Sequence, residues 1–327
     1  MRTGAPIFPR PLGPDGAGTA ACNNRGGAGA APLAITAETG GAGVQTWAGL
    51  SLDRPRIMGV LNVTPDSFSD GGRYIDPERA IEAGLMMVKD GADIVDVGGE
   101  STRPGASAVS PEEEQRRVTP VVRALAAAGV VVSIDTRNAV TMEAALGAGA
   151  AIVNDISALT HDPRSASIVA RRACPVVLMH MRGTPATMNA HAAYVDVVRE
   201  VAAELADRIA AARQAGIAAD AIAIDPGLGF AKLAPDSTAL LRGLPALAAL
   251  RRPIVLGVSR KSFIGRLGGE PDPVRRMPGS LAGGLFAIMQ GARILRVHDV
   301  PETVQAGRVW AALTSSDPSF PPPVPAR

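Results

Sequence analysis

The sequence predicts an α/β protein, a (β/α)8 barrel that follows a disordered N-terminal extension. One pattern recurs along most of the chain: an amphipathic helix, a glycine, a short apolar strand and a polar residue. Eight such strands extend over roughly 250 residues, the usual size of a closed barrel. A doubly wound open sheet is the alternative. The first strand-to-helix turn has no GxGxxG sequence, however, and eight regular repeats favour closure.

The two ends of the chain lack this pattern. Residues 1–45 are rich in glycine, alanine and proline with little periodicity, so we expect them to be disordered. The barrel domain is predicted over residues 46–314, with a short strand within Gln45–Leu52 leading into it. Residues 315–327 form an irregular, proline-rich tail.

The first barrel strand is predicted at Ile57–Leu61, an apolar run bounded by Pro55 and Asn62. A loop follows, because residues 64–67 and 70–72 have the composition of turns. This loop is long for an ordinary connection, and loops of that length are usually functional or disordered. Phe68, one of six phenylalanines in the chain, lies in its middle and favours a functional loop.

The remaining elements alternate regularly. Asp76 caps a helix with Pro77 at its first position, and Ser110 opens another in a capping box with Glu113. Glycines such as Gly91 and Gly129 end helices. Further helices are expected at 139–147, 165–172, 192–215, 236–250 and 280–290, and strands at 94–98, 130–135, 152–155, 175–180, 221–225, 253–259 and 294–298.

Composition excludes several classes of protein. The net charge is +2 without a long block of one sign, which does not indicate a nucleic-acid or membrane-surface partner. Cys22 and Cys174 form no metal-binding spacing and fit a reducing cytoplasm, with Cys174 as a small core residue. No apolar run reaches the length of about 18 residues that spans a bilayer. We therefore predict a cytoplasmic protein.

Polar residues end nearly every predicted strand, and barrel enzymes carry their chemistry at the carboxyl ends of the strands. The residues at these positions are Asn62, Asp96, Asp135, Asn154, Asp155, His180, Asp225, Ser259, Lys261, Arg296 and His298. Such a rim predicts a ligand with hydrogen-bonding edges and negative charge. The chain has 30 arginines but only three lysines, at positions 89, 232 and 261. We therefore expect position 261 to need the compact ammonium group of lysine, where arginine would not fit, and chance is the alternative for the other two lysines.

Nine motifs together resemble the dihydropteroate synthase family. They are MGVLNVTPDSFSDGG (58–72), GESTRPGA (99–106), SIDT (133–136), NDI (154–156), LMHM (178–181), DPGLGFAK (225–232), SRKS (259–262), GSLA (279–282) and RVHD (296–299). The resemblance covers roughly residues 55–312, with every motif in order. It implies the condensation of 6-hydroxymethyl-7,8-dihydropterin pyrophosphate with 4-aminobenzoate, with Mg2+, to give 7,8-dihydropteroate and pyrophosphate.

The resemblance also implies roles for individual residues. Asp135, Asn154, Asp225, Lys261 and Met179 would bind the pterin, and Asn62, Thr102, Arg103, Arg296 and His298 the pyrophosphate, with Asn62 also at the Mg2+. Phe230, Pro104, Ser262 and Phe68 would bind 4-aminobenzoate, and Asp66 lies on the same closing loop as Phe68. The catalytic residues would be Asp135, Lys261, Arg296 and Asn62. His161 and His191 are expected at the surface, and His180 behind the site.

The implied chemistry fits these residue types. Breaking the methylene C–O bond leaves positive charge on the pterin and negative charge on the pyrophosphate, so the site must stabilise both signs. Leu228 and Ala231 depart from the motif at positions that supply no polar group. Alternatives are a pterin-dependent methyltransferase, which would not need Arg296 and His298, and a catalytically silent homologue. The family also implies a homodimer and inhibition by sulfonamides.

Overall fold

The computed structural model of the protein describes residues 45–64, 76–101 and 109–314. Outside these ranges lie residues 1–44 of the predicted extension, residues 65–75 of the first loop, residues 102–108 and the tail, residues 315–327. Eight parallel strands form a sheet in the order β8-β7-β6-β5-β4-β3-β10-β9. A parallel bridge between Ile224 and Ile254 joins the two edge strands. The predicted (β/α)8 barrel is therefore confirmed, and the open-sheet alternative is wrong.

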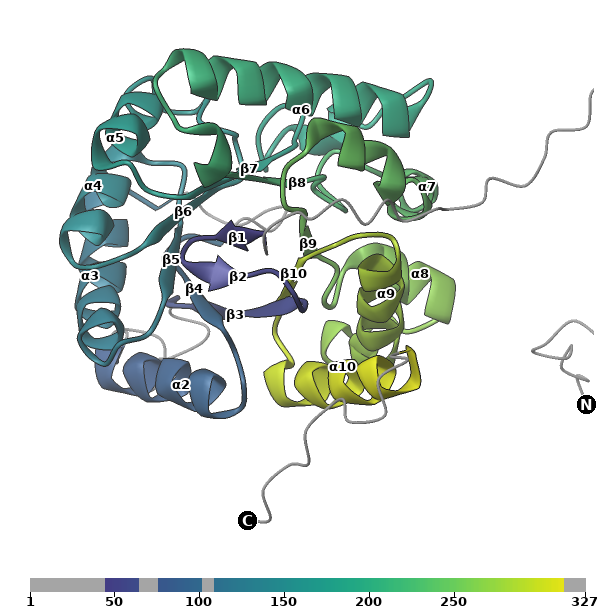
Figure 1. Ribbon diagram of the computed structural model, residues 1–327, viewed down its shortest axis with the longest axis horizontal. Coiled ribbons are helices and arrows are strands. Elements are labelled where there is room, and N and C mark those ends of the chain that lie inside the picture. The colour runs from purple at the N-terminus through teal and green to yellow at the C-terminus, as the bar shows by residue number, and fades with distance from the viewer. Residues whose placement is uncertain (1–44, 65–75, 102–108, 315–327) are drawn as a thin grey trace, which may run out of the picture. The chain divides into compact units, whose positions relative to one another are not determined.

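Figure 1 shows the helices as an outer ring around the strands. The barrel strands are β3 (Arg56–Asn62), β4 (Ile94–Gly98), β5 (Val132–Asp135), β6 (Ile152–Asp155), β7 (Val176–Met179), β8 (Ile222–Asp225), β9 (Val255–Gly257) and β10 (Ile294–Val297). The α-helices are α2 (Pro77–Lys89), α3 (Pro111–Ala127), α4 (Ala139–Gly147), α5 (Ser165–Arg172), α6 (Val197–Gln214), α7 (Ala234–Arg242), α8 (Ser262–Gly268), α9 (Met277–Met289) and α10 (Val300–Thr314).

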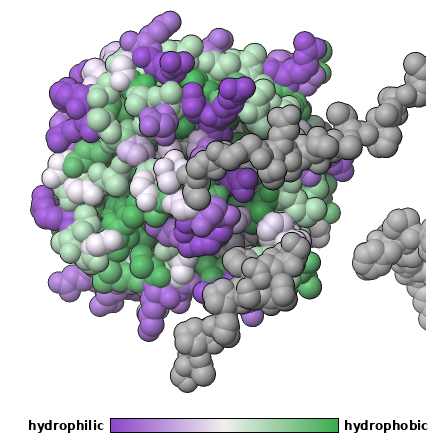
Figure 2. Space-filling model, viewed as in Figure 1, coloured by the Kyte–Doolittle hydropathy of each residue, from purple (hydrophilic) through white to green (hydrophobic). Residues whose placement is uncertain are grey.

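Local signals in the sequence set the helix starts. The Asp76 carboxylate accepts hydrogen bonds from the backbone N–H groups of Glu78 and Arg79, and the Ser110 hydroxyl accepts one from Glu113. Both helices have proline in the first turn, where no backbone N–H is needed. Capping of this kind stabilises a helix by about 1 kcal/mol. On the face shown in Figure 2, hydrophilic residues are most frequent around the periphery, as expected for an outer ring of amphipathic helices.

Alternation along the strands divides the barrel interior into layers. Side chains at positions i and i+2 of a strand point to the same side. Near the strand starts, the interior residues form one apolar cluster: Met58, Ile94, Ile152, Val177, Ala223, Val255 and Ile294. Two positions further along, four of these strands place Asp96, Asn154, Asp225 and Arg296 on the same side, and the other three place Val60, Met179 and Gly257 there. The layer nearer the carboxyl ends is therefore polar and carries the candidate site.

A short hairpin closes the other end of the barrel. The strand predicted within Gln45–Leu52 is in fact two strands, β1 (Thr46–Trp47) and β2 (Leu50–Ser51), which pair antiparallel. Ala48 and Gly49, both with positive φ, make the turn between them. The Trp47 ring is buried in the apolar cluster, and its Nε1 donates to the Ala221 carbonyl at 3.0 Å. Figure 1 shows the hairpin over the centre of the ring.

Three helix predictions were inaccurate. The helix expected at 236–250 ends at Arg242, and a 3-10 helix, Leu244–Leu250, follows, because Pro245 lacks the N–H that an α-helix would use there. The helix expected at 192–215 begins only at Val197, where Asp196 caps it. The last helix, α10, was not predicted. Among the described residues, no helix is both long and apolar enough to cross a membrane.

Candidate functional site

Arg296 lies between two carboxylates at the carboxyl end of the barrel. Its Nε donates to Asp96 Oδ2 at 2.6 Å, and its Nη2 donates to Asp135 Oδ2 at 2.5 Å. Asn154 Nδ2 donates to the same Asp96 oxygen at 3.0 Å. Four strands thus contribute one connected polar group. The structure brings Arg296, expected at the pyrophosphate, together with Asp135 and Asn154, which were expected at the pterin.

The charges in this group do not balance. One guanidinium faces two carboxylates, so a negative charge is left over in a largely buried place. Burial, together with the nearby charge of Asp96, raises the pKa of Asp135 to about 7, although Arg296 acts in the opposite direction. Burial lowers the pKa of Arg296, but the two carboxylates outweigh it and raise that pKa above its ordinary value. The guanidinium therefore keeps its charge, while Asp135 titrates near neutral pH.

Asp225 and Lys261 form a second charged part of the site. Burial raises the pKa of Asp225, opposed by the Gly227 N–H, which donates to Asp225 Oδ1 at 2.7 Å, and by the Lys261 charge. Burial lowers the pKa of Lys261 to about 8, opposed by Asp225. Lys261 Nζ lies 4.2 Å from the centre of the Phe230 ring, a cation–π contact. Buried Met179 is the register partner of Asp225 on the neighbouring strand.

The other predicted residues lie at the same end of the barrel or outside the described ranges. Asn62 is the last residue of β3 and is partly buried. His298 follows β10, where its Nδ1 is 3.0 Å from the Ser259 hydroxyl. Ser262 is exposed at the first position of α8. Asp66, Phe68, Thr102, Arg103 and Pro104 were predicted on the two closing loops and lie outside the described residues.

The remaining histidine predictions and the prediction for Cys174 agree with the structure, whereas Cys22 lies outside the described residues. His161 and His191 are exposed, and Cys174 is buried in the core. His180 is buried at the end of β7 with polar partners. Burial raises the pKa of the Cys174 thiol to about 11, so this cysteine is an inert core residue.

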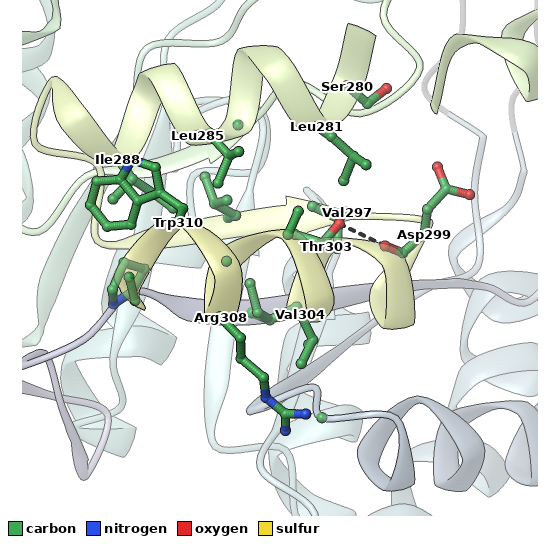
Figure 3. A pocket seen from close by; sticks show the side chains of 18 of the residues that line it. Ser280, Leu281, Leu285, Ile288, Val297, Asp299, Thr303, Val304, Arg308 and Trp310 are labelled. Carbon is green, nitrogen blue, oxygen red and sulfur yellow. Dashed lines mark hydrogen bonds between the residues drawn. The ribbon is translucent and has the colours of Figure 1, made fainter. Parts of the chain in front are cut away.

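A cavity of about 590 Å³ lies elsewhere, between α9, α10 and the strands that they cover. Figure 3 shows Leu285 and Ile288 of α9 on one side of it and Trp310 of α10 on the other. Its lining is mostly apolar and includes none of the charged residues described above, Asp96, Asp135, Asp225, Lys261 and Arg296. Ser259, whose hydroxyl contacts His298, is among the lining residues, so the cavity lies beside the candidate site but outside its charged layer.

Comparisons with known proteins identify the family. Residues 58–298 match the family model described as "Pterin binding enzyme". The chain is 48% identical to the dihydropteroate synthase of Neisseria meningitidis serogroup C over 268 residues, which is 81% of this chain and 94% of the relative. The chain belongs to the dihydropteroate synthase family.

Solved structures of the family have the same fold. The Xanthomonas albilineans dihydropteroate synthase with 4-aminobenzoic acid matches with a TM-score of 0.78 and 48% identity, covering 83% of this chain and 97% of that one. The Yersinia pestis dihydropteroate synthase in complex with a sulfonamide drug matches with a TM-score of 0.76 and 42% identity, covering 81% and 96%.

Two buried residues of this chain were given no role from the sequence. Asp96 was noted only as a strand-end residue, yet it is fully buried and holds both Arg296 and Asn154. For Lys232, chance was the alternative explanation of the lysine, yet the side chain is only 6% exposed. The one signal that could have predicted a role for Asp96 was the alternation in I-V-D-V-G (94–98), which places its side chain inside the barrel. Nothing local in the sequence showed which partners it would meet.

Proposed function

We propose that this protein condenses 6-hydroxymethyl-7,8-dihydropterin pyrophosphate with 4-aminobenzoate to give 7,8-dihydropteroate and pyrophosphate. The observation that carries the proposal is the polar layer. There Arg296 donates to both Asp135 and Asp96, and Asp96 also accepts from Asn154, beside Asp225 and Lys261. Both signs of charge are fixed there before any ligand arrives. A preorganised arrangement of this kind suits a reaction that separates charge.

The pterin would bind through its hydrogen-bonding edge. Its ring N–H and amino groups would donate to Asp225 and to the Asn154 side-chain oxygen, and its carbonyl would accept from Lys261. The Asp135 carboxylate would stabilise positive charge as it develops on the pterin. This requires Asp135 to be ionised, so its pKa of about 7 predicts lower activity in acid.

The pyrophosphate would leave toward the basic side of the site. As the methylene C–O bond breaks, its electron pair goes to the pyrophosphate oxygen, and Arg296 and His298 would donate hydrogen bonds to that anion. The 4-aminobenzoate amine, already a nucleophile at neutral pH, attacks the methylene carbon and then loses a proton to water. Thr102 and Arg103 are proposed to add to the anion site.

The 4-aminobenzoate ring would lie between Phe230 and Pro104, with its carboxylate at Ser262 and with Phe68 closing over it. The contact of Lys261 Nζ with the Phe230 ring supports this wall, because it joins the predicted pterin and aminobenzoate regions. Excluding water matters here, since a pterin cation would otherwise be hydrolysed. Sulfonamides are proposed to bind in the same place.

The residues present fit a Mg2+ ion that is shared with the substrate. Among the described residues, no group of three or more His, Cys, Asp or Glu side chains could hold a metal. Mg2+ commonly uses one or two protein oxygens and completes its shell with phosphate oxygens and water. The Asn62 amide oxygen is such a ligand. When bound, the ion would neutralise charge that accumulates on the pyrophosphate.

A homodimer is also proposed. Met289 on α9 and Val309 and Leu313 on α10 are exposed, and these two helices line the apolar cavity of Figure 3. A second copy would cover these side chains. Light scattering after gel filtration measures the mass directly, and Leu313→Glu should shift a dimer toward the monomer. The cytoplasmic location stays a prediction.

The test of function is a coupled assay. Purified protein is given dihydropterin pyrophosphate and Mg2+, with and without 4-aminobenzoate, while pyrophosphate release and the mass of dihydropteroate are followed. We expect both products only when 4-aminobenzoate is present, and neither with Asp135→Ala or Arg296→Ala. Pterin binding without turnover would indicate the silent homologue. Normal turnover in either variant would contradict the site assignment.

A further inference from the structure

Lys232 is buried, yet its ammonium group has three possible acceptors. Its Nζ lies 2.8 Å from His180 Nδ1, and it donates to the Phe230 carbonyl at 2.9 Å and to the His180 carbonyl at 3.4 Å. Acceptors that converge on one nitrogen from several directions suit a compact ammonium rather than a planar guanidinium. This geometry explains a lysine at position 232 in a chain that otherwise uses arginine.

The contacts of His180 connect Lys232 to helix α6. Because Nδ1 accepts from Lys232, the proton of the neutral ring is on Nε2, which donates to Glu204 Oε2 at 3.0 Å. Burial and the Lys232 charge lower the pKa of His180 to about 4, opposed by Glu204, so the ring is neutral at physiological pH. Arg182 holds the other Glu204 oxygen through its Nε at 3.0 Å.

The same contacts fasten the loop between β8 and α7 to the end of β7. His180 N donates to the Asp225 carbonyl at 2.9 Å. Gly227 has φ of +68°, and a Cβ at this position would lie 2.0 Å from the His180 carbonyl oxygen. The loop backbone therefore packs directly on His180. Phe230, whose carbonyl Lys232 holds, is in this loop, and its ring is the one that contacts Lys261.

We propose that Lys232 is a positioning residue for the amine substrate. By holding the Phe230 main chain against His180, it fixes the Phe230 ring beside Lys261, where 4-aminobenzoate is proposed to bind. Lys232 itself does not touch the substrate. This inference rests on the proposed function, because it assigns Lys232 to one substrate of that reaction.

The test compares the Michaelis constants of the two substrates in the full-length protein. Lys232→Met removes the donor but keeps the length and apolar stem of the side chain. We expect the KM for 4-aminobenzoate to rise about tenfold, as for a buried carbonyl that loses its hydrogen-bond donor. The KM for dihydropterin pyrophosphate should change by less than about twofold. Lys232→Arg should also raise the KM for 4-aminobenzoate more than that for the pterin substrate, because a planar guanidinium cannot donate to all three acceptors.

Lys89→Met is the matched control, since Lys89 is exposed on α2, and it should leave both constants unchanged. Glu204→Gln lies on helix α6, where the side chain is partly exposed. It weakens the hydrogen bond to His180 Nε2 without leaving a buried cavity. It should raise the KM for 4-aminobenzoate in the same direction by about twofold to threefold. This variant gives a result even if Lys232→Met does not fold.

A crystal structure of Lys232→Met, or of Glu204→Gln if the first does not fold, separates this proposal from the proposed function. We expect the Phe230 ring to leave its position near Lys261 Nζ, and this can be seen whether or not the protein makes dihydropteroate. An inactive wild type would refute the function alone. A Phe230 ring that stays in place, or equal changes in both Michaelis constants, would overturn the positioning role.

Discussion

Asp96→Asn is the substitution that best tests the electrostatics of the site. It keeps the shape of a fully buried side chain and removes one of the two negative charges that face Arg296. The amide oxygen can still accept from both Arg296 Nε and Asn154 Nδ2, but it is now an uncharged and therefore weaker acceptor. The variant therefore changes charge and orientation rather than volume.

The structure gives the direction and size of the effect. A hydrogen bond to a charged group is worth about 2 kcal/mol, which corresponds to an approximately thirtyfold loss in kcat/KM if Arg296 loses its orientation. Stability should change less. Asp96 Oδ1 is buried and has no hydrogen-bond partner within the described part of the chain, so neutralising this carboxylate recovers desolvation free energy.

The pH dependence is the more specific prediction. The Asp96 charge is one cause of the raised pKa of Asp135, and without it Arg296 would pair with Asp135 alone. The pKa of Asp135 should therefore fall. In the wild type, kcat/KM should drop as the pH falls through about 7, and Asp96→Asn should move this acid limb to lower pH.

The assay is dihydropteroate formation from pH 5 to 9 at constant ionic strength, with thermal unfolding measured in parallel. Asp220→Asn, an exposed aspartate on the 3-10 helix Ala219–Ala221, is the control and should behave as the wild type. An acid limb that stays in place or moves to higher pH in Asp96→Asn would refute the electrostatic argument, whatever happens to the rate.

Three further predictions concern stability. Trp47→Ala should lower the free energy of unfolding by about 3–5 kcal/mol, because the ring is buried in the apolar cluster. Both Michaelis constants should stay unchanged, because this cluster fills the end of the barrel opposite the site. A loss below about 1 kcal/mol in a denaturant titration would contradict this prediction. Gly227→Ala should destabilise the protein by at least about 2 kcal/mol more than Gly129→Ala. Both glycines have positive φ, but only at Gly227 would the added Cβ collide with main-chain atoms. Asp135→Asn should remove a pH dependence of the free energy of unfolding. The pKa of Asp135 is about 7 in the folded protein and 3.8 ordinarily, so between these pH values only the folded state holds the proton. The wild type should therefore lose stability as the pH rises from about 4 to 7, and the variant should not. Equal pH slopes for Asp135→Asn and wild type in urea unfolding would show that Asp135 titrates normally.

The sequence was sufficient for the fold because its signals are local. The signals include a proline after Asp76, a serine three residues before Glu113, helices that end in glycine and apolar runs that end in a polar residue. Each acts within one turn or one strand. Predicted boundaries failed where a competing local signal was overlooked, as at Pro245 and at the tight turn of Ala48 and Gly49. The strand-end rule likewise found most of the polar layer, since alternation fixes which side of a strand a residue faces.

Tertiary structure decided which of these residues meet. Arg296 is 200 positions from Asp96 in sequence, and only closure of the barrel brings β10 beside β3 and hence near β4. Burial decided the charges as well: Asp135 and Lys232 have shifted pKa values because desolvation depends on what surrounds a side chain in three dimensions. Lys232 shows the difference most clearly. In the sequence it is the last residue of the motif DPGLGFAK, whereas in the fold three acceptors from two separate segments converge on its ammonium group.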